Sequence, residues 1–289
     1  MCKTAEAQVV PASSSPAVLR WGLVALLGAA CVLWWQGIVE SGGPGRPHEH
    51  HVPTMGVLAY LIVCLVALNA GEERVKQLWK GLGLDPKATL KETMIVYNVG
   101  QVLVNAWMVY AVLQPLATGA LPVLDTFVPL QNSQAASYAL WIHYCDKYLE
   151  FLDTLFMLLR GNFKQVTFLH VYHHGTIAFA WHVATYLAWR GDAYFGVLLN
   201  SAIHVMMYSY YTLTLMGISC PWKKYLTKMQ LAQFVTVILY TLTVIVTRTI
   251  NGTHDFWFYL AAGVQIFEMS SLYFLFSAFY AKAYKKKTA

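Results

Sequence analysis

The chain has 289 residues, of which 57% are hydrophobic and only 12% are charged. Ordinary soluble domains contain about 25% charged residues, and a soluble fold of this length could not bury so much apolar surface. The net charge of +6 is spread over short segments between apolar runs, which argues against a nucleic-acid-binding protein. The composition therefore predicts an integral membrane protein that forms one helical bundle.

Eight apolar stretches come near the roughly 20 residues that a helix needs to cross a bilayer. The second is short, and the fourth carries charges. The first leaves three alternatives: a true span, an interfacial segment or a signal anchor. No small-residue cleavage motif follows it, which argues against a removed signal peptide. In chain order the stretches cover about 18–38, 55–70, 92–117, 137–159, 165–187, 193–216, 227–247 and 255–281.

The segments outside these stretches divide the chain. Residues 1–16 are polar and small and are predicted to be disordered. The linker 39–54 is rich in Gly, Pro and His and is predicted to be an exposed loop; we expect no function for its histidines, His48, His50 and His51. The predicted division is an N-terminal tail with the extra apolar stretch and linker (1–54), a transmembrane domain (55–281) and a basic cytosolic tail (282–289).

Positive charge alternates between successive loops, and the cytosolic loops of membrane proteins are the ones enriched in Lys and Arg. The pattern predicts a cytosolic C-terminus and a lumenal 118–136 loop. The N-terminus is then cytosolic if the first stretch spans the membrane and lumenal if it does not. The rich segments are 71–91, 160–164, 223–228 and 282–287, whereas 118–136 has no Lys or Arg and the remaining two gaps have only Arg190 and Arg248.

Two local signals agree with this orientation. Asn251 and Thr253 form a glycosylation sequon in a predicted lumenal loop, although very close to the membrane. Lys286 and Lys287 resemble a dilysine retrieval signal, which is read by cytosolic coat proteins; the alternative is a plain positive-inside anchor. The sequence thus predicts a multi-pass protein of the endoplasmic reticulum membrane.

Ionisable side chains inside a membrane span cost about 2.5–3.5 kcal/mol each on insertion scales, so they are functional candidates. Lys147 and Glu150 are three residues apart, and Glu150 and Thr154 are four apart, so they share a helix face with His143 one turn earlier. This stripe must face the bundle interior or a wet cavity; the alternative is a buried ion pair that only fixes helix packing. The ionisable residues of 137–159 are Asp146, Lys147, Glu150 and Asp153.

Three histidines stand together in the stretch 165–187. His170, His173 and His174 have i, i+3, i+4 spacing, which places their imidazoles on one helix face. A single buried histidine is usually a satisfied core residue, but three on one face beside lipid indicate metal ligation or histidine chemistry. His182 lies two turns further along.

The next two stretches also carry polar side chains at helical spacing. Asn200, His204, Tyr208 and Tyr211 follow one another at three- or four-residue intervals. An aromatic packing stripe would explain the tyrosines but not Asn200 with His204. The following stretch opens with polar residues at three-residue spacing, for which helix–helix hydrogen bonding is the alternative: Thr227, Gln230 and Gln233.

These residues fall into four motifs that together resemble the ELO family of very-long-chain fatty-acid elongases. The resemblance covers about 55–285 and is specific, because four spaced motifs on four consecutive predicted spans do not recur by chance. The FLHVYHH and CPWKKYLT runs resemble the polyunsaturated Δ5/Δ6-type elongases of algae and animals, whereas 18–38 departs from the family's seven-span pattern. The motifs are KxxExxDT (Lys147, Glu150, Asp153, Thr154), HxxHH (His170, His173, His174), NxxxHxxMYxYY (Asn200, His204, Met207, Tyr208, Tyr210, Tyr211) and TxxQxxQF (Thr227, Gln230, Gln233, Phe234).

The resemblance implies an all-α integral membrane fold, a seven-helix bundle (eight if 18–38 spans) in which six helices enclose a tunnel for an acyl chain. It implies condensation of malonyl-CoA with an acyl-CoA to give 3-oxoacyl-CoA, CoA and carbon dioxide, without a metal or redox cofactor. The expected substrates are polyunsaturated chains of roughly eighteen to twenty carbons. Reductases and a dehydratase are the expected partners that complete the cycle, and a homodimer remains open.

The resemblance also implies roles for individual residues. A neutral imidazole attacks a thioester and forms a reactive acyl-imidazole; His173 is the expected nucleophile, with its second ring nitrogen held by a neighbour and His204 facing it across the tunnel. Asn200 or another imidazole is expected to stabilise the enolate left by decarboxylation of malonyl-CoA. The remaining catalytic residues of the box are His170 and His174.

The other motif residues are expected to order the site or to bind substrate. A buried ion pair of Lys147 and Glu150, supported by Asp153, is expected to order the site. The anionic CoA head must stay at the cytosolic mouth, where cations can bind its phosphates. The expected substrate-binding residues are Tyr208, Tyr211, Gln230 and Gln233 in the tunnel and Arg160, Lys164, Lys223 and Lys224 at the mouth.

Two other classes of protein remain as alternatives. Membrane di-iron desaturases and hydroxylases also use HxxHH boxes, but they need several such boxes and about eight histidines, whereas one box is present here. A small helical-bundle transporter could use Lys147 and Glu150 on a substrate path, but that leaves the histidine face unexplained. Iron analysis and a transport assay in vesicles distinguish these classes from an elongase.

Overall fold

The computed structural model describes residues 15–41, 51–123, 134–187, 193–253 and 255–284. Every regular element in those ranges is helical, as predicted. The elements are α1 (Ala17–Ser41), α2 (His51–Ala70), α3 (Glu72–Gly81), α4 (Pro86–Thr89), α5 (Lys91–Ala117), α6 (Gln134–Leu149), α7 (Phe151–Leu159), the short 3-10 helix η2 (Phe163–Gln165), α8 (Phe168–Leu187), α9 (Ala193–Leu215), α10 (Lys223–Ile250) and α11 (Phe256–Tyr284).

Five of the described helices are long and apolar enough to cross a membrane: α1, α2, α5, α10 and α11. They expose many large apolar side chains on their outer faces. Such faces are stable in lipid, where apolar side chains need no cover from water. The chain is therefore an all-α, multi-pass membrane protein, and the predicted count of seven helices stays a prediction.

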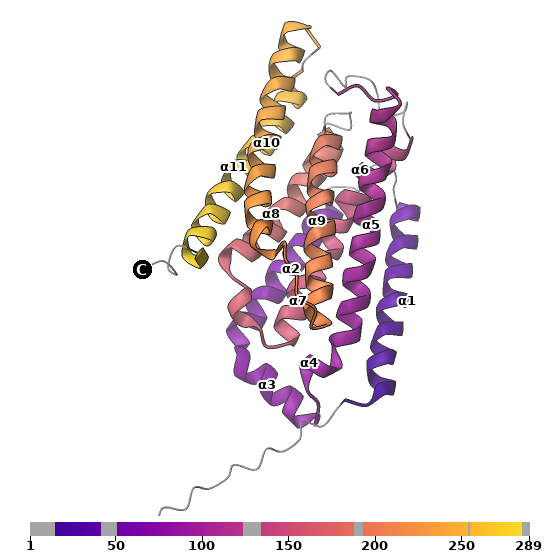
Figure 1. Cartoon of the computed structure of the whole chain (residues 1–289), viewed down its shortest axis with the longest axis vertical. Coiled ribbons are helices and arrows are strands. Elements are labelled where there is room, and N and C mark those ends of the chain that lie inside the picture. The colour runs from indigo at the N-terminus through magenta and orange to yellow at the C-terminus, as the bar shows by residue number, and fades with distance from the viewer. Residues whose placement is uncertain (1–14, 42–50, 124–133, 188–192, 254, 285–289) are drawn as a thin grey trace, which may run out of the picture.

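Helix α6 forms the centre of the bundle (Figure 1). It contacts α5, α8 and α9, and eleven of its sixteen residues are buried. Helix α1 packs on the outside of α5, and α2 packs on α8. Helices α10 and α11 form a hairpin that closes the bundle against α9 and α8. Charged residues of α6 therefore lie where lipid cannot reach them.

The two ends of the bundle differ in the way that the loop charges predict. The cation-rich segments around α3, 160–167 and 216–223 lie toward one end (Figure 1), and the indole Nε1 of Trp79 in α3 donates to the Leu159 carbonyl at 2.8 Å. At the opposite end, the hydroxyl of Tyr194 donates to the carbonyls of Pro122 and Val123 at 3.0 and 3.1 Å. Helix α1 begins at the cation-rich end.

The structure corrects several expected boundaries. The cation-rich segment 71–91 contains α3 and α4 and begins α5, so it is not a plain loop. The ends of the predicted loop 39–54 are helical, because α1 continues to Ser41 and α2 begins at His51. Ser15, inside the segment predicted to be disordered, is buried and hydrogen-bonds through its hydroxyl to that of Thr89.

The stretch 137–159 is interrupted at Glu150, between α6 and α7. The amide of Glu150 donates to the Asp146 carbonyl at 2.8 Å, whereas the amide of Asp153 donates to the Glu150 carbonyl at 3.0 Å. The second bond spans three residues instead of four, so the helix forms a single turn of 3-10 type at this point. The interruption falls on a charged residue in the middle of the bundle.

Several predictions fall on residues outside the described part of the chain. These are the disorder of 1–14, the middle of the predicted lumenal loop (124–133), the dilysine pair Lys286 and Lys287, and the side chains of His48, His50, His51 and Lys224.

Candidate active site

Two cavities lie between the helices that carry the four motifs. The first, here called the wide cavity, has a volume of about 440 Å³ and is lined by residues within 150–174, 204–211, 223–230 and 276–279. The second, here called the narrow pocket, has about 50 Å³ of free space and lies between α8, α9, α10 and α11, lined by residues within 173–184, 196–200, 233–237 and 261–272. Residues of all four motifs line these two spaces, which share one lining residue.

The first turns of α8 direct all three box histidines into the wide cavity. The Nε2 atom of His170 lies 2.7 Å from Thr154 Oγ1 of α7, and the Tyr60 hydroxyl of α2 lies 3.1 Å from the same oxygen. The His174 ring lies 4.5 Å from the His170 ring, centroid to centroid, and 6.3 Å from the Tyr60 ring. Contacts with α2 and α7 therefore fix these two histidines.

His173 occupies a different position. Of the described residues, His173 alone lines both the wide cavity and the narrow pocket. Its ring lies 6.0 Å from that of Phe276 on α11. In the described part of the chain, Nδ1 of His173 is buried without a hydrogen-bond partner, so the expectation that a neighbour holds the second ring nitrogen stays a prediction. Because His173 lines both spaces, its imidazole faces the interior of the bundle.

The predicted ion pair is present and joins the two cavities. Lys147 Nζ lies 2.6 Å from Glu150 Oε1, and both side chains are 1% exposed. Lys147 also donates to Asn200 Oδ1 at 3.1 Å, and His204 Nδ1 lies 3.0 Å from Glu150 Oε1. Glu150 and His204 line the wide cavity, whereas Asn200 lines the narrow pocket. Lys147 of α6 and Glu150, the residue between α6 and α7, therefore contact two positions of α9.

The other two carboxylates of this stripe have separate partners. The Tyr208 hydroxyl donates to Asp153 Oδ2 at 2.7 Å, at the edge of the wide cavity. Asp146 faces α5, where Gln101 Nε2 donates to its Oδ1 at 2.9 Å. Asp146 lines neither cavity, so its contacts are those of helix packing.

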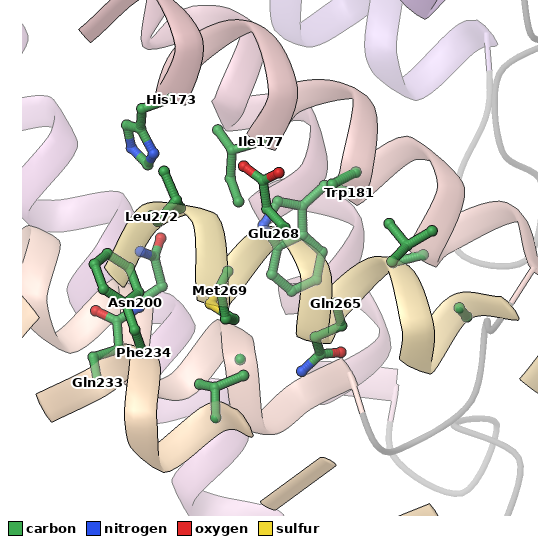
Figure 2. A pocket seen from close by; sticks show the side chains of 16 residues that line it. His173, Ile177, Trp181, Asn200, Gln233, Phe234, Gln265, Glu268, Met269 and Leu272 are labelled. Carbon is green, nitrogen blue, oxygen red and sulfur yellow. The ribbon is translucent and has the colours of Figure 1, made fainter. Parts of the chain in front are cut away.

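Aliphatic side chains and a few polar groups line the narrow pocket. Figure 2 shows His173 at one side of it, with Asn200 and Gln233 below and Glu268 and Gln265 along α11. Thr176 donates to Glu268 Oε1 at 2.6 Å. Sequence reasoning missed Glu268, although an acidic residue within the apolar stretch 255–281 is a signal of an interior polar site.

The remaining predicted residues divide between the two spaces and the rim. Tyr211 and Gln230 line the wide cavity, and Gln233 lines the narrow pocket. Lys164 and Lys223 line the outer part of the wide cavity, and Lys223 Nζ lies 5.4 Å from the centre of the Tyr210 ring. The other two predicted cations do not contribute in the same way: Arg160 is not a lining residue, and the Lys224 side chain lies outside the described part of the chain.

Two further histidines belong to the core and line neither cavity. His143 is buried, with its Nδ1 atom 3.4 Å from Ser201 Oγ and its ring centroid 4.5 Å from that of Trp181. His182 packs its ring 5.8 Å from that of Tyr144, so it does not extend the face that the three box histidines present to the wide cavity. Within the described ranges, no group of three or more His, Cys, Asp or Glu side chains could hold a metal ion.

The fold and the site together define a multi-pass helical membrane protein with a histidine at the junction of a polar cavity and an apolar pocket. Residues 47–289 match the family described as "ELO: GNS1/SUR4 family". The chain is 38% identical over 244 residues to "Very long chain fatty acid elongase 5" of Tachysurus fulvidraco, covering 83% of this chain and 78% of that protein.

Two further relatives agree with this match. "Very long chain fatty acid elongase 2" of Rattus norvegicus is 36% identical over 252 residues, covering 83% and 82% of the two chains. "Fatty acid elongase 4" of Trypanosoma brucei brucei is 34% identical over 201 residues, covering 69% and 73%. The chain belongs to the ELO, or GNS1/SUR4, family. The predicted class of enzyme, a fatty-acid elongase that acts as an acyltransferase, is confirmed by this membership.

Proposed function

We propose that this chain condenses malonyl-CoA with a long polyunsaturated acyl-CoA through an acyl-enzyme on His173, giving 3-oxoacyl-CoA, CoA and carbon dioxide. The single observation that carries the proposal is the position of His173, which lines both the wide cavity and the narrow pocket. A nucleophile at this junction can reach a thioester whose acyl chain lies in one space and whose CoA lies in the other.

The linings of the two spaces support this placement of the substrate. Ile177, Val237 and Leu272 are among the side chains around the narrow pocket, and such a lining favours a hydrocarbon chain. Because the free space is only about 50 Å³, these side chains must move apart when a long chain enters. The wide cavity has a volume of about 440 Å³, and the exposed side chains of Lys164 and Lys223 lie on its outer part. Ammonium groups bind phosphate, so these lysines suit the anionic end of CoA.

The first half-reaction transfers the acyl group to the enzyme. A ring nitrogen of His173 attacks the thioester carbonyl carbon, the carbon–sulfur bond breaks, and the CoA thiolate leaves as the thiol after it accepts a proton. The imidazole supplies that proton when it is acylated. CoA therefore dissociates before malonyl-CoA enters, which makes the reaction ping-pong.

The second half-reaction forms the carbon–carbon bond. Malonyl-CoA loses carbon dioxide, and the electron pair of the broken bond attacks the acyl carbon on His173. The carbon–nitrogen bond then breaks, and the departing ring nitrogen takes up one proton from the medium, which restores the neutral imidazole. No electron is gained or lost overall, so the proposed reaction needs no redox cofactor.

Two neighbours are placed to assist these steps. Lys147 donates to Oδ1 of Asn200, so the amide nitrogen of Asn200 remains to donate to an enolate oxygen in the pocket that it shares with His173. His204 lies against Glu150 and lines the wide cavity with His173, where it can move the proton of the leaving thiol. Preorganised donors of this kind stabilise developing negative charge.

The proposed substrate class rests on the motif context of the box histidines and on the names of the relatives, which specify very long chains. The test is expression in yeast fed with individual fatty acids, followed by profiling of fatty-acid methyl esters. Polyunsaturated acids of roughly eighteen to twenty carbons should be extended by two carbons more readily than saturated ones. Equal or better use of palmitoyl-CoA would contradict the proposal.

We also propose that the protein resides in the endoplasmic reticulum with its C-terminus in the cytosol, where reductases and a dehydratase complete the cycle. The gathering of cation-rich segments at one end of the bundle supports this orientation. A C-terminal tag in sealed microsomes should be open to protease, and a protected tag would contradict the orientation. Changing Lys286 and Lys287 to Ser should let some protein leave this compartment; unchanged localisation would remove the retrieval signal only.

A further inference from the structure

Glu268 and Gln265 are two polar side chains in a pocket that is otherwise mostly apolar. Both belong to α11, are three residues apart and line the narrow pocket. Glu268 is buried, and its Oε1 accepts a hydrogen bond from Thr176 at 2.6 Å. Gln265 is half-buried. Thr176 remains the partner of Glu268 whichever chain is bound, and a fully saturated acyl chain offers neither side chain a further polar contact. The proposed reaction at His173 does not use either residue.

The rise of an α-helix shows which carbon of a bound acyl chain would lie beside Glu268. The pocket runs along α8 from His173 to Ala184, and Glu268 contacts Thr176, one turn beyond His173. One turn is about 5 Å, and an extended chain advances about 1.2 Å per bond, as an extended polypeptide does. Glu268 therefore lies beside about the fifth or sixth carbon of an acyl group bound to His173.

Gln265 lies roughly 4.5 Å further along α11 from Glu268, in the direction away from His173 (Figure 2). That distance corresponds to between three and four further bonds, and places Gln265 beside about the ninth carbon. Methylene-interrupted double bonds repeat every three carbons, so the spacing of the two residues is close to the spacing of two successive double bonds.

The chemistry of the two side chains suits double bonds. The amide N–H of Gln265 can donate a weak hydrogen bond to a π face, and a carboxyl oxygen of Glu268 can accept a weak C–H···O contact. Carbon–hydrogen bonds on and between double bonds are more acidic than those of saturated methylenes, so they are better donors. We propose that Glu268 and Gln265 determine specificity, by favouring acyl chains with double bonds near carbons five to six and nine over chains saturated there.

This inference rests on the proposed condensation of polyunsaturated acyl-CoA, and competition assays in microsomes from expressing yeast can test it. The probes are three eighteen-carbon acyl-CoAs: one saturated, one with double bonds at carbons nine and twelve, and one with double bonds at six, nine and twelve. Ratios of kcat/KM within one sample do not depend on the amount of folded protein. The variants are Glu268→Met and Gln265→Met, which remove the polar atoms at similar volume.

Glu268→Met should lower the preference for the chain with the carbon-six double bond over the chain without it, by roughly two- to five-fold. Gln265→Met should instead lower the preference for the chain unsaturated at carbon nine over the saturated chain, by a similar factor. Glu268→Gln, which keeps an oxygen acceptor, should retain the wild-type ratios. Phe267→Leu is the matched control on α11, because Phe267 is 68% exposed and lines neither cavity.

Unchanged ratios in both methionine variants, or equal changes in both ratios, would overturn this inference while the proposed function stands. A wild-type enzyme that prefers the saturated chain would overturn both. Better use of a hydroxylated eighteen-carbon chain than of the unsaturated chains would also overturn the inference, because the polar pair would then recognise a hydroxyl group.

Discussion

The wide cavity and the narrow pocket share His173 but differ in every other lining residue. Histidines, tyrosines and acidic groups surround the wide cavity, with lysines at its outer part. Around the narrow pocket, aliphatic side chains predominate, and its polar groups are spaced singly along the walls. Helices α8 to α11 contribute to both, whereas the acidic groups of the wide cavity, Glu150 and Asp153, come from the start of α7 and the residue before it. The change in character therefore occurs along α8 and α10, and α11 does not follow it, because its aromatic side chains line the wide cavity and its polar ones the narrow pocket.

Helix α8 shows how the sequence produces this change. Its inward face carries His170 and His173 in the first turns and then Ile177, Ala180 and Ala184. These steps of three or four residues keep one face of a helix, so the face passes from polar to apolar within a few turns. Helix α10 repeats the pattern, from polar side chains near its start to aliphatic ones further along. Under the proposed function, this gradient favours one direction of binding for a substrate with a charged head and an apolar tail.

The largest expected effect concerns the residues that connect the two spaces. Lys147→Ala leaves Glu150 buried without its cation, and breaking one partner of a buried ion pair costs about 3–5 kcal/mol of stability. Thermal unfolding in detergent should show a lower Tm, and microsomes should show little condensing activity.

The exposed lysine Lys76, which pairs with Glu72 on α3, is the matched control. Lys76→Ala should leave both Tm and activity close to wild type, because an exposed pair contributes little. Near-normal turnover in Lys147→Ala would show that the connection between the two spaces is not required.

The next largest effect tests whether the narrow pocket holds the acyl chain. Ala184 lies at the end of the pocket on α8, eleven residues from His173, which is about 16 Å of helix. Ala184→Phe should block the end of a long chain, and overpacking of this kind costs about 1–3 kcal/mol. Activity on eighteen-carbon acyl-CoA should fall roughly ten-fold, while shorter acyl-CoAs are still elongated, as product profiling would show.

Ala232→Phe provides the control, because Ala232 is an exposed residue of α10 that lines neither cavity. If Ala184→Phe and Ala232→Phe give the same chain-length profile, the narrow pocket does not hold the acyl chain.

The smallest expected effect concerns the outer part of the wide cavity. Lys223 is exposed there, and an exposed charge acts weakly and is screened by salt. Lys223→Ala should raise KM for acyl-CoA and malonyl-CoA by a few-fold at low salt, with little change in kcat, and the difference should shrink at high salt. Lys228→Ala, an exposed residue of the same helix outside the cavity, should not change KM. Equal effects of the two substitutions would argue against a CoA site here.

Much of the fold could be predicted from the sequence, because a lipid bilayer requires long apolar helices and favours Lys and Arg in the loops on one side. Apolar length predicted the long helices, and loop charge predicted which segments gather at one end. Periodicity could not reveal the interruption at Glu150, because a one-residue tightening leaves the hydrophobic pattern unchanged. It also could not separate Asp146 from Asp153, since the difference between a packing contact with α5 and a position at the cavity depends on how α6 and α7 meet.

The candidate site was predictable to the level of helix faces. Spacing placed His170, His173 and His174 together, but only the positions of α10 and α11 distinguish His173 as the residue between the two cavities. Glu268 was overlooked because no motif contains it. Its isolation in an apolar stretch was the available signal, and its partner Thr176 comes from a helix 92 residues away in the chain.

The most direct test of the proposed acyl-enzyme is intact mass spectrometry of purified protein incubated with acyl-CoA alone. One acyl group should be added, and it should map to a histidine in the peptide 165–187 and disappear when malonyl-CoA is supplied. His182→Phe should retain the adduct, because His182 packs against Tyr144 away from both cavities. An unmodified mass in active protein, or an adduct that persists in His173→Ala, would contradict the assignment of His173 as the nucleophile.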